Sequence, residues 1–328
     1  MSTDRRAVAV VVVNLDGEAL LPACLDALGR QTVAPAEVVV ADNGSRDRSL
    51  TLLAERYPHV RVLALDHNHG FAGGANRGVA TTRAPLVCVL NSDAEPAPDW
   101  LERLLAVPWA DDVWALGSVL VSARNGRVES AGDQYSAQGY AYKLLRDRPL
   151  EDLPGEPYRV FAAPGAAPVF RRDVFDALGG YAEHFFLYYE DVDLAFRAVL
   201  AGYAALMVPH ARVRHQLGAT TRSRARVRFY VARNSIRCAV RCLPEPDVPA
   251  LVRRWVAELW WNRPRRLAAV EIAGRLAGLG GLRRSLRERQ AIQSARTATT
   301  DHVEAMLRPP AAVARSQGVA SVAGRPRR

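Results

Sequence analysis

The chain has 328 residues, of which 49% are hydrophobic and 24% are charged. This composition is typical of a folded protein and excludes a wholly disordered chain, a collagen and a coiled coil. The formal net charge of +10 is uneven: residues 1–211 carry 19 basic and 27 acidic side chains, whereas residues 212–328 carry 25 and 7. Every basic residue except Lys143 is an arginine. We therefore expect a mildly acidic body followed by a region that binds an anionic partner.

The chain contains four cysteines, Cys24, Cys88, Cys238 and Cys242. They are too few for a disulfide framework at this length, so we expect buried free thiols and a reducing compartment. No run reaches about 18 apolar residues, which argues against a membrane span. The apolar run Ala7–Val13 follows two arginines, but no small-residue cleavage site comes after it. We therefore expect a first strand rather than a signal peptide, and a cytoplasmic protein.

The first 95 residues alternate between short apolar runs and amphipathic segments. The runs predict strands at Ala7–Val13, Glu37–Ala41, Val60–Leu65 and Pro85–Leu90. The amphipathic segments predict helices at Glu18–Leu28 and Asp47–Tyr57, and a short helix after the glycine-rich segment Gly70–Gly78. Continuous apolar strands that alternate with helices indicate a parallel sheet covered on both faces, with its ligand crevice beyond the carboxyl ends of the strands.

Polar side chains follow each of these four predicted strands. They are Asn14 and Asp16, Asp42 and Asn43, Asp66 and Asn68, and Asn91 and Asp93. One such pair is ordinary loop composition, but four in succession at one edge of a sheet favour a binding site. Because the chain has no phosphate-loop lysine motif, the pattern suggests a nucleotide held by side chains and a metal ion. Asp42 is placed to accept a hydrogen bond from a pyrimidine N–H, or it is simply a helix N-terminal acid.

The glycine-rich segment contains Gly70, Gly73, Gly74 and Gly78. It follows the third strand and lacks G-x-G-x-x-G spacing, so a dinucleotide-binding loop is a poor match. These glycines either let the backbone approach a ligand closely or form a tight turn.

Beyond residue 96 the pattern is less regular. It predicts strands at Val113–Val121 and Ala204–Val208 and an extended segment at Val160–Phe170. It also predicts a helix that stops at Gly202, with Val192, Ala195, Phe196, Val199 and Leu200 on one face. The remainder is helical and arginine-rich, and after about residue 308 it passes into a tail that we expect to be disordered.

Two groups of residues could carry chemistry. Asp93, in Asn91-Ser92-Asp93, offers a carboxylate at an exposed strand end, as a phosphate-bridging Mg²⁺ or Mn²⁺ requires, and Asn91 could orient it or contact the sugar. Glu190, Asp191 and Asp193 lie at a predicted helix start, where acids complement the helix dipole. Asp193 is spaced to pair with Arg197. Three acids exceed what capping needs, so one of them is a candidate general base.

Six segments, in this order and spacing, resemble family 2 glycosyltransferases with the GT-A fold, in the bacterial branch that includes rhamnosyltransferases of cell-wall and polysaccharide assembly. They are VVVNLDG (11–17), VVVADNGSRDRS (38–49), NHGFAGGANRG (68–78), VLNSDAEP (89–96), GGYAEHFFLYYEDVDLAFRAVLAGY (179–203) and VRHQLGAT (213–220). VRFYVARNS (227–235) resembles a further helix of this branch. The resemblance spans about residues 7–240. It implies a Rossmann-like, mostly parallel central sheet flanked by helices, with a C-terminal helical extension.

The resemblance also implies a role for each site residue. Asn14 and Asp42 would contact the nucleotide, and Asn68, Gly70 and Gly73 would line the nucleotide-sugar pocket. Asp93 would hold Mg²⁺ or Mn²⁺ on the diphosphate, with His215 as the second protein ligand. Asp191 would be the general base, with Glu190 beside it in the acceptor pocket. The usual D-x-D begins with Asn91 here, a form that the rhamnosyltransferase branch often shows.

These roles imply that the acceptor hydroxyl displaces the nucleoside diphosphate in one step, which inverts the configuration at the anomeric carbon. The favoured donor is dTDP-rhamnose, and the favoured acceptor is a hydroxyl of a glycan or of a polyprenyl-diphosphate-linked sugar. The alternatives are a transferase for a soluble natural product, a nucleotidyltransferase or other nucleotide-sugar enzyme, and a nucleic-acid-binding protein that uses the basic region.

The basic region predicts a membrane contact rather than nucleic acid. Residues 251–261 place Val252, Trp255, Val256, Leu259 and Trp260 on one helical face flanked by arginines. Such a helix lies in a membrane interface, which a lipid-linked acceptor would require; the alternative is packing on the body. We expect an anionic membrane surface to contact residues 250–290, and the protein to sit peripherally on the inner face of the plasma membrane.

The expected organisation has four parts. Residues 1–95 form the nucleotide-sugar-binding half of one domain and residues 96–222 form its acceptor-binding and catalytic half. Residues 223–308 form a basic amphipathic helical extension, and residues 309–328 form the disordered tail.

Overall fold

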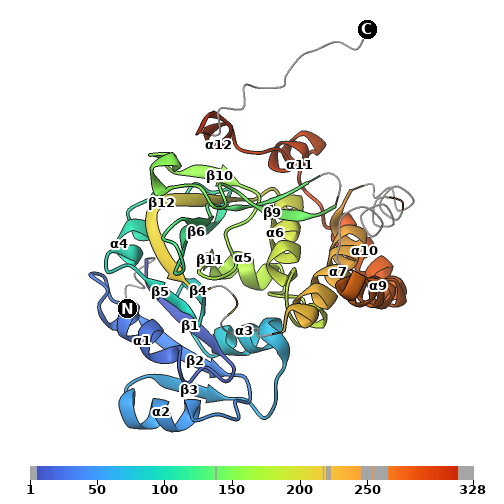
Figure 1. Cartoon of the computed structure of the whole chain (residues 1–328). Coiled ribbons are helices and arrows are strands. Elements are labelled where there is room, and N and C mark those ends of the chain that lie inside the picture. Colours follow the sequence, from blue (N-terminus) through green and yellow to red (C-terminus); the bar gives the residue numbers. More distant parts are fainter. Residues whose placement is uncertain are drawn as a thin grey trace.

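The computed structural model of the chain (Figure 1) describes residues 6–136, 139–216, 218, 223–244, 253 and 265–316. Its strands are β1 (Val8–Asn14), β2 (Glu37–Asp42), β3 (Arg61–Ala64), β4 (Leu86–Asn91), β5 (Ala94–Pro96), β6 (Val113–Ser122), β7 (Val128–Ser130), β8 (Asp133–Tyr135), β9 (Ala141–Lys143), β10 (Tyr158–Val160), β11 (Val169–Arg171) and β12 (Ala204–His215). Its α-helices are α1 (Leu21–Gly29), α2 (Ser49–Arg56), α3 (Gly70–Ala80), α4 (Trp100–Leu105), α5 (Arg172–Ala177), α6 (Glu190–Leu200), α7 (Arg224–Cys242), α9 (Arg265–Gly280), α10 (Leu282–Ser294), α11 (Thr300–Met306) and α12 (Ala311–Ser316). Two 3₁₀ turns, η1 (Leu150–Asp152) and η2 (Glu183–Phe185), complete the described elements.

One central sheet organises the molecule. Its strand order is β10-β12-β6-β11-β4-β1-β2-β3, with β5 beside β12 and β7 beside β6. β1 pairs in parallel with β2 and β4, β2 with β3, and β12 with β6, whereas β11 runs antiparallel to both β4 and β6. The sheet is therefore mostly parallel, as the sequence predicts. β8 and β9 form a separate two-stranded sheet.

Helices cover both faces of the sheet at β1 and β4, which is why these two strands are apolar up to their final asparagine. β1 is fully buried, and its alternate side chains enter two different cores. Val10 belongs to the core that contains residues of α1, α2 and α4, and Val11 belongs to the core that contains residues of α3, α5, α6 and α7. In Figure 1, α1 and α2 lie on one side of the β1–β3 strands and α3 on the other.

The glycine-rich segment differs from its prediction. Gly70–Ala80 is itself helix α3, not a loop that precedes a helix. A Cβ atom on Gly78 would lie 2.4 Å from Cγ1 of Val11, and one on Gly74 would lie 3.1 Å from Nδ2 of Asn43. The glycines therefore let α3 approach β1 closely, and this packing outweighs their poor intrinsic helix propensity.

The predicted strands and helices of the first 95 residues otherwise agree with the structure to within a few residues. Two later elements bear on the site. α6 begins at Glu190, so Glu190, Asp191 and Asp193 lie in its first turn, at the helix start where the sequence predicts them. β12 extends beyond Val208 to His215, which places that histidine at the end of a strand in the central sheet.

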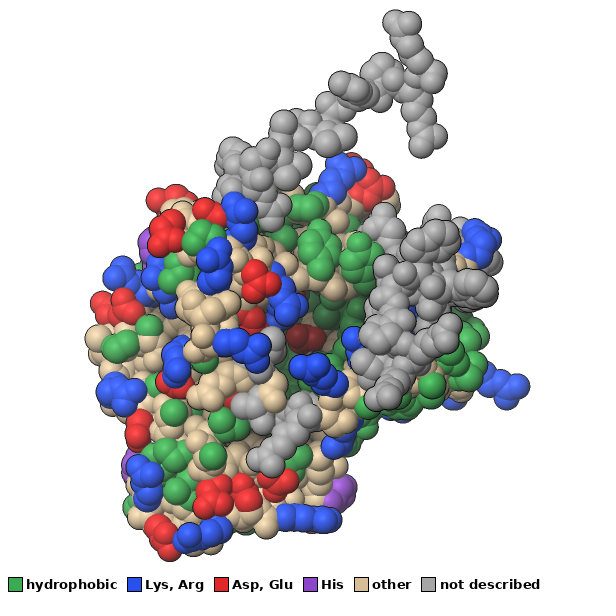
Figure 2. Space-filling view, in the orientation of Figure 1, with side chains coloured by type: hydrophobic (Ala, Val, Ile, Leu, Met, Phe, Trp, Pro, Cys, Tyr) green, Lys and Arg blue, Asp and Glu red, His purple; other side chains and the backbone are tan. Residues whose placement is uncertain are grey.

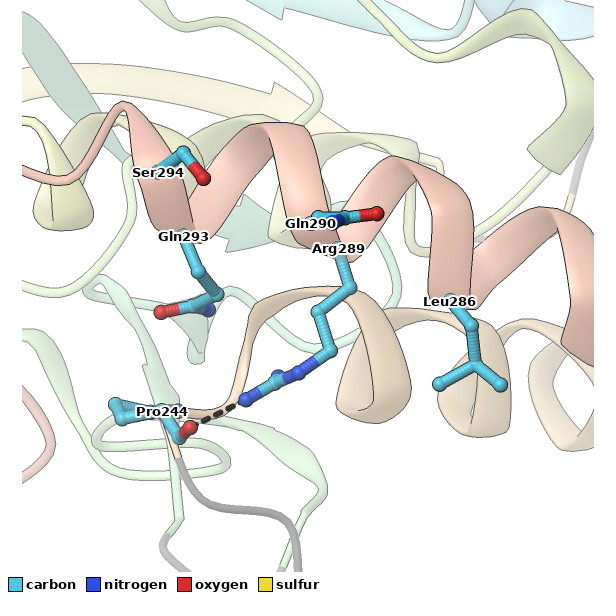
Figure 3. A pocket seen from close by; sticks show the side chains of 6 residues that line it. All are labelled: Pro244, Leu286, Arg289, Gln290, Gln293 and Ser294. Carbon is cyan, nitrogen blue, oxygen red and sulfur yellow. Dashed lines mark hydrogen bonds between the residues drawn. The ribbon is translucent and has the colours of Figure 1, made fainter.

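The C-terminal helices pack on the body. Cys238 and Cys242 of α7 are buried in the core that also contains α6, and all four cysteines are free and buried, as predicted. Arg289 of α10 donates to the carbonyl oxygens of Val240, Leu243 and Pro244 at the end of α7 (Figure 3). A guanidinium in this position satisfies carbonyls that a helix terminus leaves unpaired.

The prediction of a disordered tail from residue 309 is wrong for its first part. Residues 311–316 form α12, and Val313 is fully buried, because its side chain packs into the core beside α11. Residues 317–328 lie outside the described residues, as do residues 251–261 with the exception of residue 253, so the predicted Trp-containing stripe is not placed. Among the described helices, none has the length and apolar character needed to span a bilayer.

Candidate active site

The predicted site residues come from strand ends that meet at one edge of the sheet. Asn14 ends β1 and lies opposite Asp42, which ends β2. Asn91 ends β4 and lies opposite Val13 of β1. His215 ends β12 and lies opposite Ala94, one residue after Asp93. Parallel pairing of β1 with β2 and β4, and antiparallel pairing of β12 with β5, thus bring together side chains from four distant parts of the chain.

Asn14 and Asp42 form a buried pair on the β1–β2 side of the site. Nδ2 of Asn14 donates to Oδ2 of Asp42 at 2.9 Å, and both residues are fully buried. Asp42 also accepts from the backbone N–H of Ser45 at 3.0 Å and from its hydroxyl at 2.6 Å. Oδ1 of Asn14 is buried with no hydrogen-bond partner in the described part of the chain. An amide oxygen held in this way is available to a ligand.

Asn43 connects this pair to the start of α3. Its amide donates to the carbonyl of Gly70 at 2.9 Å and to Oδ1 of Asn68 at 3.2 Å. Asn68 in turn accepts from the backbone N–H of Gly70 at 2.8 Å. Gly73 lies elsewhere on α3, where its missing side chain faces His69 and Arg77. The structure therefore links Asn68 and Gly70 to the Asn14–Asp42 pair through Asn43. The open side of Gly73 faces His69 and Arg77 instead.

Asp93, Asn91 and His215 converge on one point. Nε2 of His215 lies 3.2 Å from Oδ1 of Asp93 and 3.5 Å from Nδ2 of Asn91. Asp93 and His215 are both buried. Oδ1 of Asn91 is buried and has no hydrogen-bond partner among the described residues. A carboxylate oxygen, an amide oxygen and an imidazole nitrogen form a donor set that suits Mn²⁺ or Mg²⁺.

Glu129 contacts the ring nitrogen of His215 that faces away from Asp93, and Lys143 pairs with Glu129. Neither role was predicted from the sequence. Oε2 of Glu129 lies 2.8 Å from Nδ1 of His215, and its Oε1 accepts from Nζ of Lys143 at 2.7 Å. Burial acts against the charged forms, but these partners outweigh it. They lower the pKa of Glu129 to about 2, and Asp93 and Glu129 together raise the pKa of His215 to about 9. The unique lysine was the one signal in the sequence that pointed to this network.

Asp191 lies in the first turn of α6, against Gly165. Its Oδ1 accepts from the N–H of Val192 at 2.8 Å, and a Cβ atom on Gly165 would lie 2.4 Å from its Oδ2. Desolvation and the nearby charge of Asp133 raise the pKa of Asp191 to about 6, against the opposing effects of Val192 and Lys143. A carboxylate with this pKa can accept a proton near neutral pH.

The two other acids of this turn have different surroundings. Glu190 is buried, and burial together with the charge of Asp191 raises its pKa well above the usual value. Asp193 is fully buried and pairs with Arg197 at 2.9 Å, as predicted, and also with Arg241 of α7 at 2.7 Å. Of the three acids, Asp191 is therefore the one suited to act as a base.

The segment before α6 has an unusual backbone. Phe186, Tyr188 and Tyr189 have φ angles of 66°, 66° and 71°, in the left-handed region that non-glycine residues rarely adopt. Phe186 also lies against Gly70: a Cβ atom on Gly70 would be 2.4 Å from the carbonyl oxygen of Phe186. Strained backbone of this kind is concentrated at functional sites. Here it lies between the start of α3 and the acids of α6.

The site opens to the surface. A pocket beside it is lined by Glu129 and His215 and by three arginines, Arg124, Arg146 and Arg214. Figure 2 shows acidic side chains at the bottom of a hollow on one face of the molecule, with basic side chains around its rim. A second groove lies between α10 and the end of α7 (Figure 3), and the described residues that line it include none of the predicted site residues.

Comparison with known proteins agrees with this geometry. The family model described as glycosyl transferase family 2 matches residues 8–179. An N-acetylglucosaminyl-diphospho-decaprenol L-rhamnosyltransferase of Mycobacterium tuberculosis is 30% identical over 241 residues, which cover 65% of this chain and 76% of that protein. The O-antigen chain rhamnosyltransferase RfbN of Salmonella typhimurium is 26% identical over 230 residues, which cover 66% of this chain and 68% of that protein.

Solved structures show the same fold at low sequence identity. The mannosyltransferase PcManGT of Pyrobaculum calidifontis, in complex with GDP-Man and Mn²⁺, superposes with a TM-score of 0.53 at 17% identity, covering 88% of this chain and 85% of that one. The Staphylococcus aureus TarS fragment 1–349 with UDP superposes with a TM-score of 0.54 at 15% identity, covering 95% and 92%. These matches confirm the GT-A fold predicted from the sequence.

Proposed function

Because the chain belongs to glycosyl transferase family 2, we propose that it is a metal-dependent, inverting rhamnosyltransferase of cell-wall or polysaccharide assembly. The favoured donor is dTDP-rhamnose, and the favoured acceptor is a hydroxyl of a glycan or of a polyprenyl-diphosphate-linked sugar. The two rhamnosyltransferase relatives support this choice of sugar. The observation that carries the proposal is Asp191, a carboxylate of raised pKa that feels the charge of Lys143. Lys143 in turn pairs with Glu129, the residue that contacts His215 of the Asp93–His215 pair.

The donor would bind along the ends of β1, β2 and β4. The Asn14–Asp42 pair would contact the nucleotide base, with Asp42 as acceptor and the unpartnered Oδ1 of Asn14 as a further acceptor. The Asn68–Gly70 turn would lie beside the nucleotide-sugar, because Asn43 links it to the same strand end. Asp93, His215 and Asn91 would hold Mg²⁺ or Mn²⁺, which when bound neutralises charge on the departing diphosphate.

Asp191 would act as the general base. Its carboxylate removes the proton of the acceptor hydroxyl as that oxygen attacks the anomeric carbon. One displacement on the face opposite the leaving group inverts the anomeric configuration, and no enzyme nucleophile is needed. Glu190 would lie beside Asp191 in the acceptor pocket, where burial and the charge of Asp191 raise its pKa and favour its neutral form.

The substitution Asp191→Asn tests this role. It keeps the shape of the side chain and removes the base, so we expect transfer to fall by about 10²–10⁴-fold. Donor binding, measured by calorimetry, should stay nearly unchanged. Asp176→Asn, in an exposed carboxylate of α5, is the matched control and should be fully active. Substantial transfer by Asp191→Asn would reject Asp191 as the base.

A screen of UDP-, GDP- and dTDP-sugars identifies the donor. Each nucleotide-sugar is incubated with the enzyme and a short-chain prenyl diphosphate that carries N-acetylglucosamine, and nucleoside diphosphate release is measured. We expect dTDP-rhamnose to give the highest rate. Turnover with the donor but not with this acceptor would favour a soluble acceptor instead.

We further propose that the C-terminal helices bind the inner face of the plasma membrane and keep the otherwise cytoplasmic enzyme beside a lipid-linked acceptor. Ile272, Leu276 and Leu279 of α9 and Leu286 of α10 are exposed, and Leu276 is the most exposed at 63%. Figure 2 shows hydrophobic side chains gathered over this part of the molecule. α10 also exposes Arg283, Arg284 and Arg287. Exposed apolar side chains next to arginines are typical of helices that lie on anionic lipid.

A further inference from the structure

We propose that Asn234 of α7 is a positioning residue for catalysis: it holds the segment Phe185–Tyr189 in the conformation that places Glu190 and Asp191 in the cleft. The inference rests on the proposed role of Asp191 as the base. It assigns a part of the active site to a helix that lies beyond residues 8–179, the part matched by the family model.

The side-chain amide of Asn234 meets three backbone carbonyls of one short segment. Its Nδ2 donates to the carbonyl oxygens of Phe185 and Leu187, each at 2.9 Å, and of Tyr188 at 2.7 Å. Asn234 is fully buried. Its Oδ1 accepts from Nε of Arg233 at 2.9 Å, which fixes the orientation of the amide with the NH₂ group toward the carbonyls.

The carbonyls that Asn234 gathers belong to the strained segment. The left-handed backbone at Phe186, Tyr188 and Tyr189 is unfavourable by itself and persists only where surrounding contacts hold it. Tyr189 is the N-cap residue of α6, so a change in its backbone angles would turn the first helical turn relative to the cleft. That turn carries Glu190 and Asp191.

Other residues of α7 fix the two ends of the same segment. Arg233 and Arg237 donate to the carbonyl of His184 at 3.3 and 3.1 Å, at the start of the segment. Arg241 pairs with Asp193 at 2.7 Å, within α6. Because these contacts anchor the ends, the loss of Asn234 would release the middle of the segment and leave α7 in place. The expected effect is therefore local and falls on the catalytic step.

The test compares Asn234→Leu and Asn234→Asp with the control Ser235→Ala. Leu and Asp both approximate the shape of Asn and remove the NH₂ donor. Ser235 is the next residue on α7, and its hydroxyl donates only within the helix, to the carbonyl of Ala232. Transfer from the donor found in the screen, nucleoside diphosphate binding by calorimetry, and hydrogen exchange of the 185–191 amides are measured for each.

We expect both Asn234 variants to lose about 10²-fold in kcat, because a misplaced base costs about this much. Nucleoside diphosphate affinity and KM for the donor should stay within about twofold, since Asn14, Asp42 and Asp93 are untouched. Exchange should increase at residues 185–191 and not in β1 or β4. Ser235→Ala should match the unmodified enzyme in all three measurements.

Two results would overturn the inference. One is a lower melting temperature with unchanged kcat, which would make Asn234 purely structural. The other is unchanged exchange at residues 185–191 despite lower activity. If one variant does not fold, the other decides. Asp191→Asn is measured in parallel: if it keeps its activity, the base assignment fails, whereas the kcat and exchange of the Asn234 variants still report on the segment.

Discussion

His215 and Glu129 form a buried pair in which Nδ1 of the histidine lies 2.8 Å from Oε2 of the glutamate. The pair orients the opposite ring nitrogen, Nε2, toward Asp93. In metal sites a carboxylate behind a histidine fixes the tautomer and the ring orientation of the ligand. The pair therefore supports the proposal that His215 and Asp93 act together, although 121 residues of chain lie between them.

Replacing Glu129 with Gln tests this support. The amide keeps the size of the side chain but loses the charge that orients His215, so we expect Mn²⁺ affinity to fall by about 10–100-fold. Electron paramagnetic resonance with Mn²⁺ measures the affinity directly. Glu151→Gln, at an exposed position, is the control and should bind Mn²⁺ normally. Equal affinity in the two variants would show that Glu129 does not support a metal site.

Removal of divalent metal should stop transfer. On the proposed function, Asp93, Asn91 and His215 would offer two oxygen donors and one nitrogen donor to a cation, which would offset the charge of the departing diphosphate. We expect EDTA to abolish transfer, and Mn²⁺ or Mg²⁺ to restore it. Asp93→Asn should lose activity at any metal concentration that supports the unmodified enzyme. Full activity in chelator would remove the metal role from Asp93 and His215.

The activity should fall on the acid side near pH 6. The proposed base, Asp191, would act as a carboxylate, and desolvation raises its pKa from 3.8 to about 6, so it would become protonated and inactive at a higher pH than an ordinary aspartate. The charge of Asp133 on β8 also favours protonation of Asp191, whereas the N–H of Val192 and the charge of Lys143 on β9 oppose it. Asp133→Asn removes one of the neighbours that favour protonation, so the acid limb of kcat/KM should move to lower pH. A profile that stays flat to about pH 5 would contradict the assignment.

Gly70→Ala should damage the contact between α3 and the strained segment. Gly70 has a φ of +76°, and an added Cβ would lie 2.4 Å from the carbonyl oxygen of Phe186. The left-handed conformation alone costs about 1–2 kcal/mol for a non-glycine residue. The melting temperature should therefore fall by several degrees and transfer should drop with it. Gly29→Ala, where an added Cβ meets nothing within 4 Å, should be neutral in both measurements.

Membrane binding should depend on the apolar side chains of α9 and α10. In a flotation assay with anionic liposomes, the unmodified protein should float at low salt and less at high salt, because screening weakens the arginine contribution. Leu276→Glu combined with Leu286→Glu should abolish flotation. Leu50→Glu, at a leucine of α2 that is 40% exposed, is the control and should float normally. Failure of the unmodified protein to float at low salt would reject the membrane contact.

The grouping of Asn14, Asp42 and Asn91 at the strand ends was predictable, because it follows from local sequence patterns. Each apolar run is short and ends in polar residues, and parallel pairing alone brings Asn14, Asp42 and Asn91 to one edge. The register of β1 against β2 and β4 needs no information beyond the hydrophobic pattern.

The roles of Glu129, Lys143 and Asn234 were not predictable, because they depend on contacts between segments that are far apart in the sequence. Glu129 and Lys143 lie in short strands with no clear periodicity, and they meet His215 only after β12 has joined the sheet. Asn234 stands beside Ser235 in an arginine-rich helix, a pattern that ordinarily indicates a solvent-exposed face. The glycines of α3 have a low intrinsic helix propensity, so the sequence indicated a loop at this place. Helix propensity does not report the close packing of α3 on β1 that favours glycine here.

The ion pair between Asp193 and Arg241 has a consequence for exchanging parts between related enzymes. A chimera that joins residues 8–179 to a foreign C-terminal half keeps α6 and α7 from one parent, so this pair and the Asn234 contacts move as a block. A junction placed between α6 and α7 would separate the fully buried Asp193 from Arg241, one of its two guanidinium partners, and would therefore destabilise the chimera. The smallest segment that should be exchanged between related enzymes as one unit therefore begins before His184 and includes all of α7.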